Sequence, residues 1–421
     1  MEVKPGYKRT EVALIPEEWE VKQIADIANV GSGGTPSREN SRYWDGDIPW
    51  VTTAQLDFKV IHEADQKITR EGLANSAARV LPPGTILMAM YGQGKTRGKV
   101  GILGIEAATN QACASIDISG DMLRDFVFRF LESRYDEIRN LSNSGSQENL
   151  SGQIVRAIPV VCPPLPEQRA IATALSDVDA LLTQLDRLIA KTRDIKQAAM
   201  QQLLTGKTRL PGFGGEWQVK RLGEHATFLR NGVHSRAELT EEGSVKYLHY
   251  GDIHTSPRVR LDPAVTAMPC LPAHKAATLD RLRTGDLVFA DASEDMDGVG
   301  KSVEIGTIDD GSELVSGLHT IAARFDRSIL ADGFKAYLQF CPAFRSQLYR
   351  LAAGTKVYAT TRNHIASIEI ALPCLEEQTA IATLLSDLDA ELAALEARRD
   401  KTSALKQGMM QELLTGRTRL T

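Results

Sequence analysis

A 44-residue segment occurs twice in the chain, and this duplication constrains the fold more than any other feature. Residues 167–210 and 377–420 align without a gap at an offset of 210 residues, and 26 of the 44 positions are identical. That offset is far longer than the roughly 20–50 residues of a solenoid repeat. The chain therefore has two similar halves, and the repeated segment closes each of them.

Both copies of the segment have a helical period. The apolar positions of the first copy are Ile171, Leu175, Val178, Leu182, Leu185 and Ile189, continued by Ile195, Ala199 and Leu203. Those of the second copy are Ile381, Leu385, Leu388, Leu392 and Leu395, continued by Leu405, Met409 and Leu413. Alternating steps of four and three residues place one apolar seam along a helix. The pattern predicts an intramolecular antiparallel coiled coil; the alternative is that each helix packs only on its own domain.

The ends of the two predicted helices are marked by proline and glycine. Each helix follows a proline-containing stretch and ends near a Thr-Gly pair, where Gly206 and Gly416 are suited to a left-handed C-cap. About 35 helical residues at ~1.5 Å each span roughly 50 Å.

Weaker echoes of the repeat outline the rest of the chain. Residues 18–22 resemble residues 216–220, and each copy precedes a globular segment, about 30–160 and 228–372, with little mutual similarity. Short apolar runs bounded by glycine and proline predict strands mixed with helices in both segments. The C-terminal end resembles the stretch that leads into the second half, so it is expected to lie near the N-terminus. We therefore predict an α+β protein in which two mixed α/β domains are separated by two long helices in a closed, pseudo-two-fold, circular arrangement.

Composition excludes several classes of protein. The chain is 43% apolar and 24% charged, as in ordinary globular proteins, and has no run of 18 apolar residues. Five scattered cysteines without a Cys-x-x-Cys pair argue against a disulfide framework or a zinc site and predict a cytoplasmic protein. The net charge of −5 means that any nucleic-acid contact depends on local basic groups.

Taken together, several motifs make the chain resemble the specificity subunit of a type I restriction-modification enzyme. They are the helix starts 164–168 and 375–378, the helix ends 203–206 and 413–416, Pro16 with Trp19, and the runs 33–37, 43–50, 109–112 and 250–253. The resemblance covers nearly the whole chain. The second globular segment departs from the family pattern, with residues 230–236 in place of a Gly-Gly-Thr-Pro run.

The resemblance implies a protein without chemistry of its own. Residues 1–162 and 211–373 would be target-recognition domains that read the halves of a split, asymmetric DNA site. Residues 163–210 and 374–421 would be helical spacers that also dock two modification subunits, with restriction subunits joining them. S-adenosylmethionine, ATP and Mg²⁺ would belong to those partners, and this chain would carry no cofactor or metal. It would be cytoplasmic and associate with the nucleoid through double-stranded DNA.

Candidate DNA contacts are side chains that match base edges or phosphates, together with Gly34, whose backbone amide is suited to a phosphate; the alternative for Gly34 is an ordinary turn. The densest cluster in the first half runs from Tyr91 to Lys99, where Gln93 is suited to adenine and Arg97 to guanine; the alternative is a solvated hairpin tip. The candidates there are Gly34, Thr35, Tyr91, Gln93, Lys95, Thr96, Arg97, Lys99, Ser146, Gln147 and Asn149. Those in the second half are Arg230, Asn231, His234, Arg236, Tyr250, His254, Lys301, Lys356, Tyr358, Thr360 and Arg362.

Two other functions stay open at this point. The run from Ala89 to Thr96 fits a relaxed phosphate-loop pattern, which would indicate a nucleotide-binding enzyme or a nuclease acting through Lys95 and Thr96. However, the residues that follow are typical of a hairpin return rather than a helix start. The second alternative is a coiled-coil scaffold that recruits partners without reading DNA.

Overall fold

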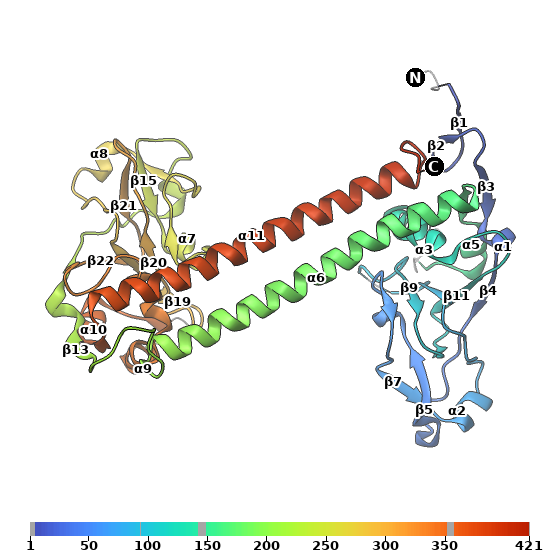
Figure 1. The fold of residues 1–421 in the computed structure, drawn as a ribbon, viewed down its shortest axis with the longest axis horizontal. Helices are drawn as coiled ribbons and strands as arrows, with labels where there is room; N and C mark the ends of the chain where they lie inside the picture. Colours follow the sequence, from blue (N-terminus) through green and yellow to red (C-terminus); the bar gives the residue numbers. More distant parts are fainter. Residues whose placement is uncertain (1–4, 93, 142–148, 352–357, 421) are drawn as a thin grey trace. The chain divides into compact units, whose positions relative to one another are not determined.

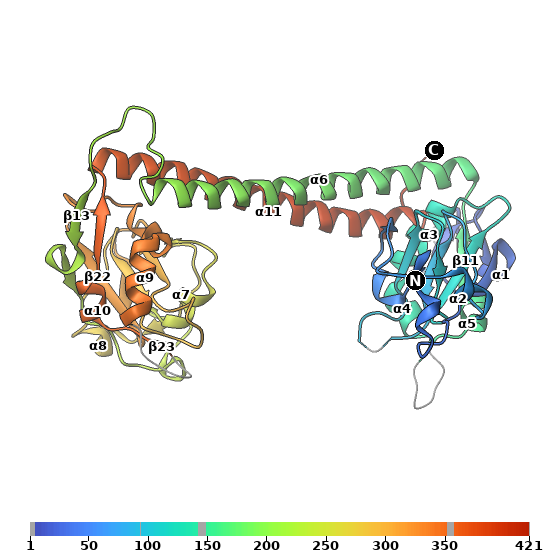
Figure 2. The same ribbon diagram turned by 90° about the horizontal axis from the view of Figure 1, so that it is seen from below.

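The computed structural model describes residues 5–92, 94–141, 149–351 and 358–420, and the chain divides into two compact units (Figures 1 and 2). Residues 1–185 and 398–421 form the first unit, and residues 186–397 form the second. Because the division crosses both long helices, each unit contains one half of each helix. The four-part division into two recognition domains and two helical spacers stays a prediction.

The first unit holds a mixed α/β domain. Its strands are β1 (Tyr7–Arg9), β2 (Leu14–Pro16), β3 (Glu20–Gln23), β4 (Ala28–Ser32), β5 (Trp44–Val51), β6 (Val60–Ile61), β7 (Gln66–Ile68), β8 (Ile86–Ala89), β9 (Val100–Leu103), β10 (Ala108–Thr109), β11 (Cys113–Ile118) and β12 (Pro159–Cys162). Its short helices are α1 (Ile24–Ile27), η1 (Ser41–Tyr43), η2 (Thr53–Gln55), α2 (Arg70–Ala74), α3 (Arg124–Ser133), α4 (Tyr135–Arg139) and α5 (Gly152–Ala157).

The second unit also holds a mixed α/β domain. Its strands are β13 (Gln218–Arg221), β14 (Ala226–Phe228), β15 (Val245–Leu248), β16 (Arg260–Leu261), β17 (Cys270–Leu271), β18 (Leu287–Ala290), β19 (Ala292–Ser293), β20 (Ser302–Ile305), β21 (Glu313–Ser316), β22 (Thr320–Phe325), β23 (Tyr358–Ala359) and β24 (Glu369–Leu372). Its short helices are η3 (Leu222–His225), η4 (Arg236–Glu238), α7 (Tyr250–Thr255), α8 (Ala273–Ala276), η5 (Lys335–Phe340), α9 (Pro342–Leu351) and α10 (Arg362–Ser367).

The two globular domains have the same sheet topology despite their dissimilar sequences. A five-stranded sheet has the order β4-β11-β8-β9-β6 in the first unit and β14-β22-β18-β20-β16 in the second. A three-stranded sheet has the order β10-β5-β7 in the first and β21-β15-β17 in the second. The central strands β8 and β18 are buried along their whole length, which explains their uninterrupted apolar sequences.

The long helices α6 (Leu165–Leu203) and α11 (Leu375–Leu413) have 39 residues each. Within each unit their halves pack against each other in antiparallel directions, so the predicted helix pair is confirmed (Figure 1). Both end as predicted, because Gly206 and Gly416 take positive φ angles of 67° and 69° just beyond the last turn. Among the helices of the described residues, none is long and apolar enough to cross a membrane.

The apolar seam of each helix continues differently from the prediction. Ile195 and Leu405, which occupy equivalent repeat positions, are 48% and 58% exposed rather than packed in the seam. The buried positions after Ile189 and Arg399 are instead Thr192 and Thr402, at the next three-residue step. The seam therefore keeps its spacing, but one step is polar, and apolar residues are buried again at Leu203 and Leu413.

The same Lys–Asp ion pair joins the helices in both units. Lys406 of α11 contacts Asp179 of α6 in the first unit (2.9 Å), and Lys196 of α6 contacts Asp389 of α11 in the second. The partners in the globular domain differ between the units. Arg129 of α3 also contacts Asp179 (2.5 Å), whereas the Tyr337 hydroxyl of η5 donates to Asp389 (2.8 Å). One repeated carboxylate thus anchors two different domains.

A buried carboxylate marks the start of each long helix. Glu167 of α6 accepts two hydrogen bonds from Arg419 (2.6 and 2.8 Å) and one from the indole N–H of Trp19 (3.1 Å). Tyr7 donates to the backbone carbonyl of Gly416 (2.9 Å) in the same unit. The expectation that the C-terminal end lies near the N-terminal segment is therefore confirmed.

The equivalent carboxylate in the second unit is Glu377 of α11. The guanidinium of Arg209, which follows α6, donates to both of its oxygens. The same guanidinium lies 5.7 Å from the ring centre of Trp217, as that of Arg419 lies 5.6 Å from Trp19. A Thr-Arg-Leu sequence follows both long helices. In each case its arginine binds the buried carboxylate at the start of the other long helix.

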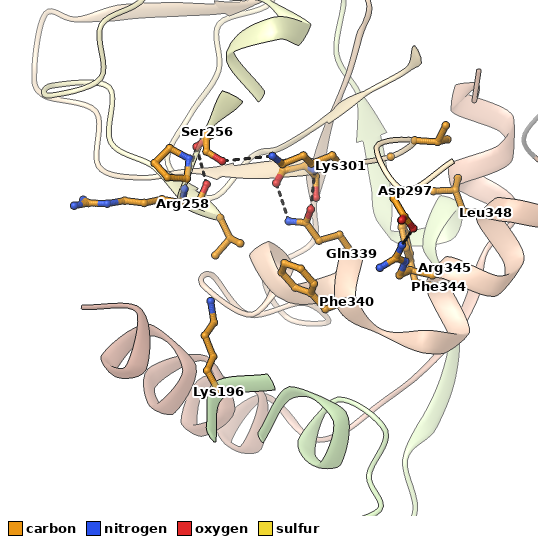
Figure 3. Close-up of a pocket in the computed structure, with 15 residues that line it drawn as sticks. Lys196, Ser256, Arg258, Asp297, Lys301, Gln339, Phe340, Phe344, Arg345 and Leu348 are labelled. Atoms are coloured by element: carbon orange, nitrogen blue, oxygen red, sulfur yellow. Dashed lines mark hydrogen bonds and ion pairs between the residues drawn. The ribbon is translucent and has the colours of Figure 1, made fainter. Parts of the chain in front are cut away.

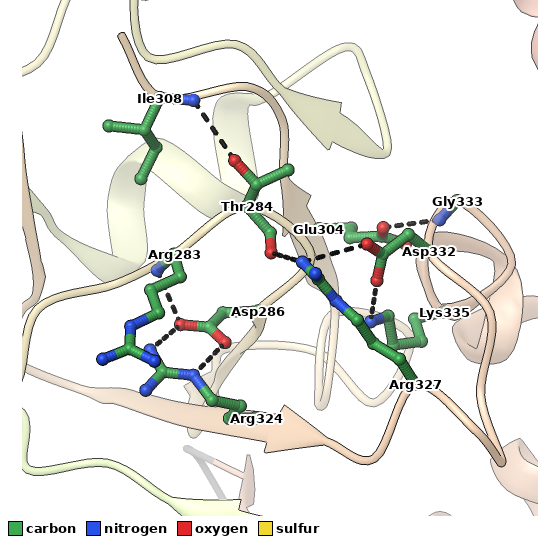
Figure 4. A network of polar contacts seen from close by, with 10 residues as sticks. All are labelled: Arg283, Thr284, Asp286, Glu304, Ile308, Arg324, Arg327, Asp332, Gly333 and Lys335. Atoms are coloured by element: carbon green, nitrogen blue, oxygen red, sulfur yellow. Dashed lines mark hydrogen bonds and ion pairs between the residues drawn. The ribbon is translucent and has the colours of Figure 1, made fainter. Parts of the chain in front are cut away.

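Ion pairs also hold the second five-stranded sheet at one end (Figure 4). The buried Asp286, before β18, accepts from Arg324 of β22 at 2.7 and 2.8 Å. Buried Glu304 of β20 accepts from the backbone N–H groups of Gly333 and Ala336 (2.5 and 2.9 Å). These contacts fix the end of the sheet opposite to the loops described next.

Candidate DNA interface

In the first unit, four loops meet at the end of the five-stranded sheet where β4 and β8 finish and β11 begins. Backbone hydrogen bonds join them. The N–H of Gly34 donates to Thr109 (2.8 Å), that of Met90 donates to Ala112 (2.8 Å), and that of Leu150 donates to Met90 (2.9 Å). The loop positions are thus set by main-chain groups rather than by particular side chains.

The second unit has the same frame of backbone hydrogen bonds. The N–H of Gly232 donates to Ser316 (2.8 Å), that of Asp291 donates to His319 (3.1 Å), and that of Thr360 donates to Asp291 (2.8 Å). A frame built from main-chain groups leaves the outward side chains free to differ between the two units. Such an arrangement suits two surfaces of one shape with different specificities.

An aromatic side chain contacts the equivalent loop glycine in both units, Gly34 in the first and Gly232 in the second. The indole N–H of Trp50 donates to the carbonyl of Gly34 (3.0 Å), and a Cβ on Gly232 would lie 2.6 Å from the ring of Tyr247. Gly34 is buried, and its N–H and C=O are both used within the domain. Its predicted role of offering an amide to phosphate is therefore not available in this structure.

The remaining predicted residues of the first unit lie on these loops with different exposures. Thr35, Tyr91 and Lys95 are exposed, and Asn149 is half-buried. Thr96 and Lys99 of the same hairpin are half-buried, and Lys99 forms an ion pair with Asp57 (2.6 Å). Gln93, Ser146 and Gln147 lie outside the described residues.

Arg97 differs from its prediction. The side chain is only 6% exposed, so its guanidinium does not face solvent, where it would have to be to pair with guanine. The hairpin packs against α4 on both sides of the arginine: Gly98 lies against the backbone of Arg139, and Tyr135 donates to the carbonyl of Lys95. In this structure Arg97 belongs to the packing of the domain.

The predicted residues of the second unit gather around the same end of its sheet. Exposed Arg362 donates to the carbonyl of Leu229 (2.7 Å) and to the side chain of Asn231 (2.8 Å). Arg236 pairs with Asp252 (2.7 Å). Of the other predicted residues, Arg230 is exposed and Thr360 is buried. The half-buried ones are His234, Tyr250, His254, Lys301 and Tyr358. Lys356 lies outside the described residues.

Arg38 is a candidate that the sequence pattern did not identify. Its guanidinium lies 3.6 Å from the ring centre of Trp44 and donates to Gln66 (2.6 Å). The side chain is exposed on the loop that follows Gly34. Only long-range contacts reveal it, because Arg38 stands in the sequence as an isolated arginine among polar residues.

Burial shifts the pKa of several groups near the second interface. It raises the pKa of Asp291, lowers that of His249 and lowers that of Lys301, whose ammonium group donates to the backbone carbonyl of His254 (2.7 Å). Hydrogen bonds, chiefly from the backbone N–H of Ser235, lower the pKa of Glu238 to about 2. Among the described residues, no group of three or more potential ligands is placed to hold a metal ion.

A cavity of about 350 Å³ adjoins these loops within the second unit (Figure 3). Four of its lining side chains are cationic, Lys196, Arg258, Lys301 and Arg345, against one carboxylate, Asp297. Part of this charge is already compensated, since Arg345 pairs with Asp297 (2.6 Å) and Lys196 with a carboxylate of α11. The remaining positive charge favours an anion such as a DNA phosphate.

The phosphate-loop alternative is not supported by the local fold. After β8 the chain turns and returns as β9, which pairs antiparallel with β8. A phosphate loop requires a helix whose N-terminus faces the phosphates. The predicted hairpin return is confirmed.

Comparison with known proteins agrees with this geometry. Residues 16–192 match the family model described as the type I restriction modification DNA specificity domain. The specificity subunit of the MjaVIII enzyme of Methanocaldococcus jannaschii is 22% identical over 99% of this chain and 96% of its own length. That of MjaIX, from the same organism, is 29% identical over 42% of this chain and 41% of its own.

Solved structures show the same fold. The S subunit of a type I system from M. genitalium superimposes with a TM-score of 0.60, at 13% identity, over 98% of both chains. The HsdS subunit of Thermoanaerobacter tengcongensis gives 0.50, at 18% identity, over 96% of this chain and 98% of the other.

The protein is thus a DNA-specificity component of a restriction-modification system. It belongs to the family of type I specificity subunits, which determine DNA target recognition and are themselves non-catalytic.

Proposed function

We propose that this chain reads a split, asymmetric DNA site, with one half-site for the loop cluster of each unit. The observation that carries this proposal is the shared backbone frame with different side chains. Arg38 and Thr35 are exposed on the loops of the first unit, and Arg362 and Arg230 on those of the second. Two readers with different side chains select two different half-sites, so the target is not a palindrome.

The long helices supply the spacing in this proposal. Readers that act on one face of B-DNA need half-sites about one helical turn, roughly 10 base pairs, apart. Since α6 and α11 both run from one unit into the other, their length sets the number of unread base pairs. The domain boundaries expected from the sequence, with recognition domains at 1–162 and 211–373, remain part of this proposal.

Docking of two modification subunits also belongs to the proposal, and restriction subunits would join through them. The apolar residues of the two helix seams were predicted for this role of spacer and docking site, and they differ in how far they are exposed. Ile171, Leu175, Leu185, Ile381, Leu385 and Leu392 are buried, and Val178, Leu182, Leu388 and Leu395 are half-buried. Exposed Ile195 and Leu405, at equivalent repeat positions, offer two similar apolar contacts to two copies of one partner. S-adenosylmethionine, ATP and Mg²⁺ are assigned to the partner subunits.

Replacing Arg362 with alanine is expected to weaken binding by about 1–3 kcal/mol and to relax the preference at one base pair of one half-site. The carbonyl of Leu229 and the side chain of Asn231 hold the guanidinium in a fixed position at the end of the sheet. The substitution therefore removes a pre-oriented contact to one base. Arg38→Ala is expected to do the same for the other half-site. Arg38→Lys should not restore the preference, because a lysine lacks the planar group that stacks on Trp44.

Competition binding with duplexes that each carry one substituted base pair measures both effects. Arg327→Ala is the matched control. Arg327 is an exposed arginine that also donates to a backbone carbonyl, that of Thr284 (2.7 Å), but it lies at the opposite end of the sheet (Figure 4). An equal loss of affinity on all duplexes would make Arg362 a phosphate contact rather than a base reader.

A further inference from the structure

His319, which no sequence pattern marked, has an unusual backbone conformation. Its φ angle is 57°, in the left-handed region that residues other than glycine rarely occupy. The equivalent residue of the first unit is Ala112, since the loops 109–113 and 316–320 have the same length and the same hydrogen bond to the preceding strand. Ala112 has no positive φ. The shared frame therefore does not require the strained conformation, which is particular to the loop of the second unit.

The imidazole of His319 is held from two sides. Its Nδ1 lies 3.2 Å from Oδ1 of Asp291, and its ring meets that of Tyr250 edge to face at 5.4 Å. The side chain is nevertheless 51% exposed. Nε2 has no hydrogen-bond partner among the described residues. A strained backbone that presents a half-exposed, pre-oriented ring is typical of functional sites.

Asp291 connects this histidine to the rest of the interface. Its backbone carbonyl accepts from the N–H of Thr360, two residues before Arg362. Tyr250 also packs against His249 and His254 at 4.5 and 5.9 Å. The ring of His319 thus belongs to a rigid group of loops at the end of the sheet.

We propose that His319 is a base-reading residue of the second unit and that Asp291 is its positioning residue. The inference rests on the proposed reading of DNA by these loops. With Nδ1 donating to Asp291, Nε2 of a neutral ring accepts from the amino group of adenine or cytosine, and Nε2–H of a charged ring donates to guanine. The ligand is therefore one base edge in the major groove of the half-site read by this unit.

The test uses the full chain in complex with its modification subunits and duplexes carrying single base-pair substitutions. His319→Gly removes the ring and also the strain, because glycine accepts a positive φ. We expect a melting temperature no lower than that of the wild type, together with about a tenfold or greater loss of discrimination at one base pair.

Two further variants separate reading from folding. Asp291→Asn should reduce discrimination at the same base pair and at no other. His274→Ala, at an exposed position of helix α8, should change nothing. If the wild type prefers a split site and His319→Gly keeps the whole preference, the inference about His319 is wrong while the proposed function stands. If the wild type prefers no sequence, both are wrong.

Discussion

Replacing Glu167 with glutamine is expected to lower the free energy of unfolding by about 2–4 kcal/mol. The carboxylate is 4% exposed and serves both Arg419 and Trp19. An amide of the same shape keeps one acceptor, but it turns an N–H₂ group toward the guanidinium, which leaves that cation poorly compensated. Denaturant unfolding of the full chain measures the change.

Glu18→Gln is the matched control for this variant. Glu18 contacts the same arginine (2.6 Å), but its side chain is 54% exposed. A solvated ion pair contributes only about 0–1 kcal/mol, so the control should be nearly neutral. Equal effects of the two substitutions would show that burial of Glu167 is not what locks the helix start. Glu377→Gln tests the second unit in the same way.

A four-residue insertion in both long helices, after Leu185 and after Leu395, is expected to lengthen the unread spacer by one or two base pairs. Four helical residues add about 6 Å, against about 3.4 Å per base pair. The two positions are equivalent in the repeat, so both helices lengthen by the same amount. Selection of bound sequences from a randomised DNA library gives the spacer directly.

The half-sites themselves should stay the same in the lengthened protein, because the loop clusters are untouched. A control insertion after Asp310, in the exposed turn before β21, should leave both spacer and half-sites unchanged. If the spacer keeps its length when the helices are longer, the helices do not set it.

The duplicated segment allowed the long helices, their glycine ends and the two-part plan to be predicted from sequence. The phase of the seam beyond Ile189 could not be predicted, because polar Thr192 occupies the seam position and apolar Ile195 lies outside it. A prediction from apolar residues alone therefore places Ile195 in the seam instead of Thr192. Arg209 and Arg419 were also missed, since a repeated arginine after a helix carries no local sign of its distant carboxylate.

The interface was predictable only in its general position. Residues 230–236, 250–254 and 358–362 do converge, but the convergence depends on backbone hydrogen bonds that no side-chain pattern records. For the same reason, the identical sheet topology of the two domains could not be predicted from the sequence. Burial of Arg97 and exposure of Arg38 and His319 follow from contacts between segments far apart in the chain.

The most direct test of the proposed function is methylome sequencing of cells that express this chain with its modification subunit. We predict methylated adenines within a split sequence that has two different specific halves and a spacer of fixed length. The methylation should disappear when this chain is deleted. Methylation of an unbroken or palindromic sequence, or a pattern that does not depend on this chain, would contradict the account.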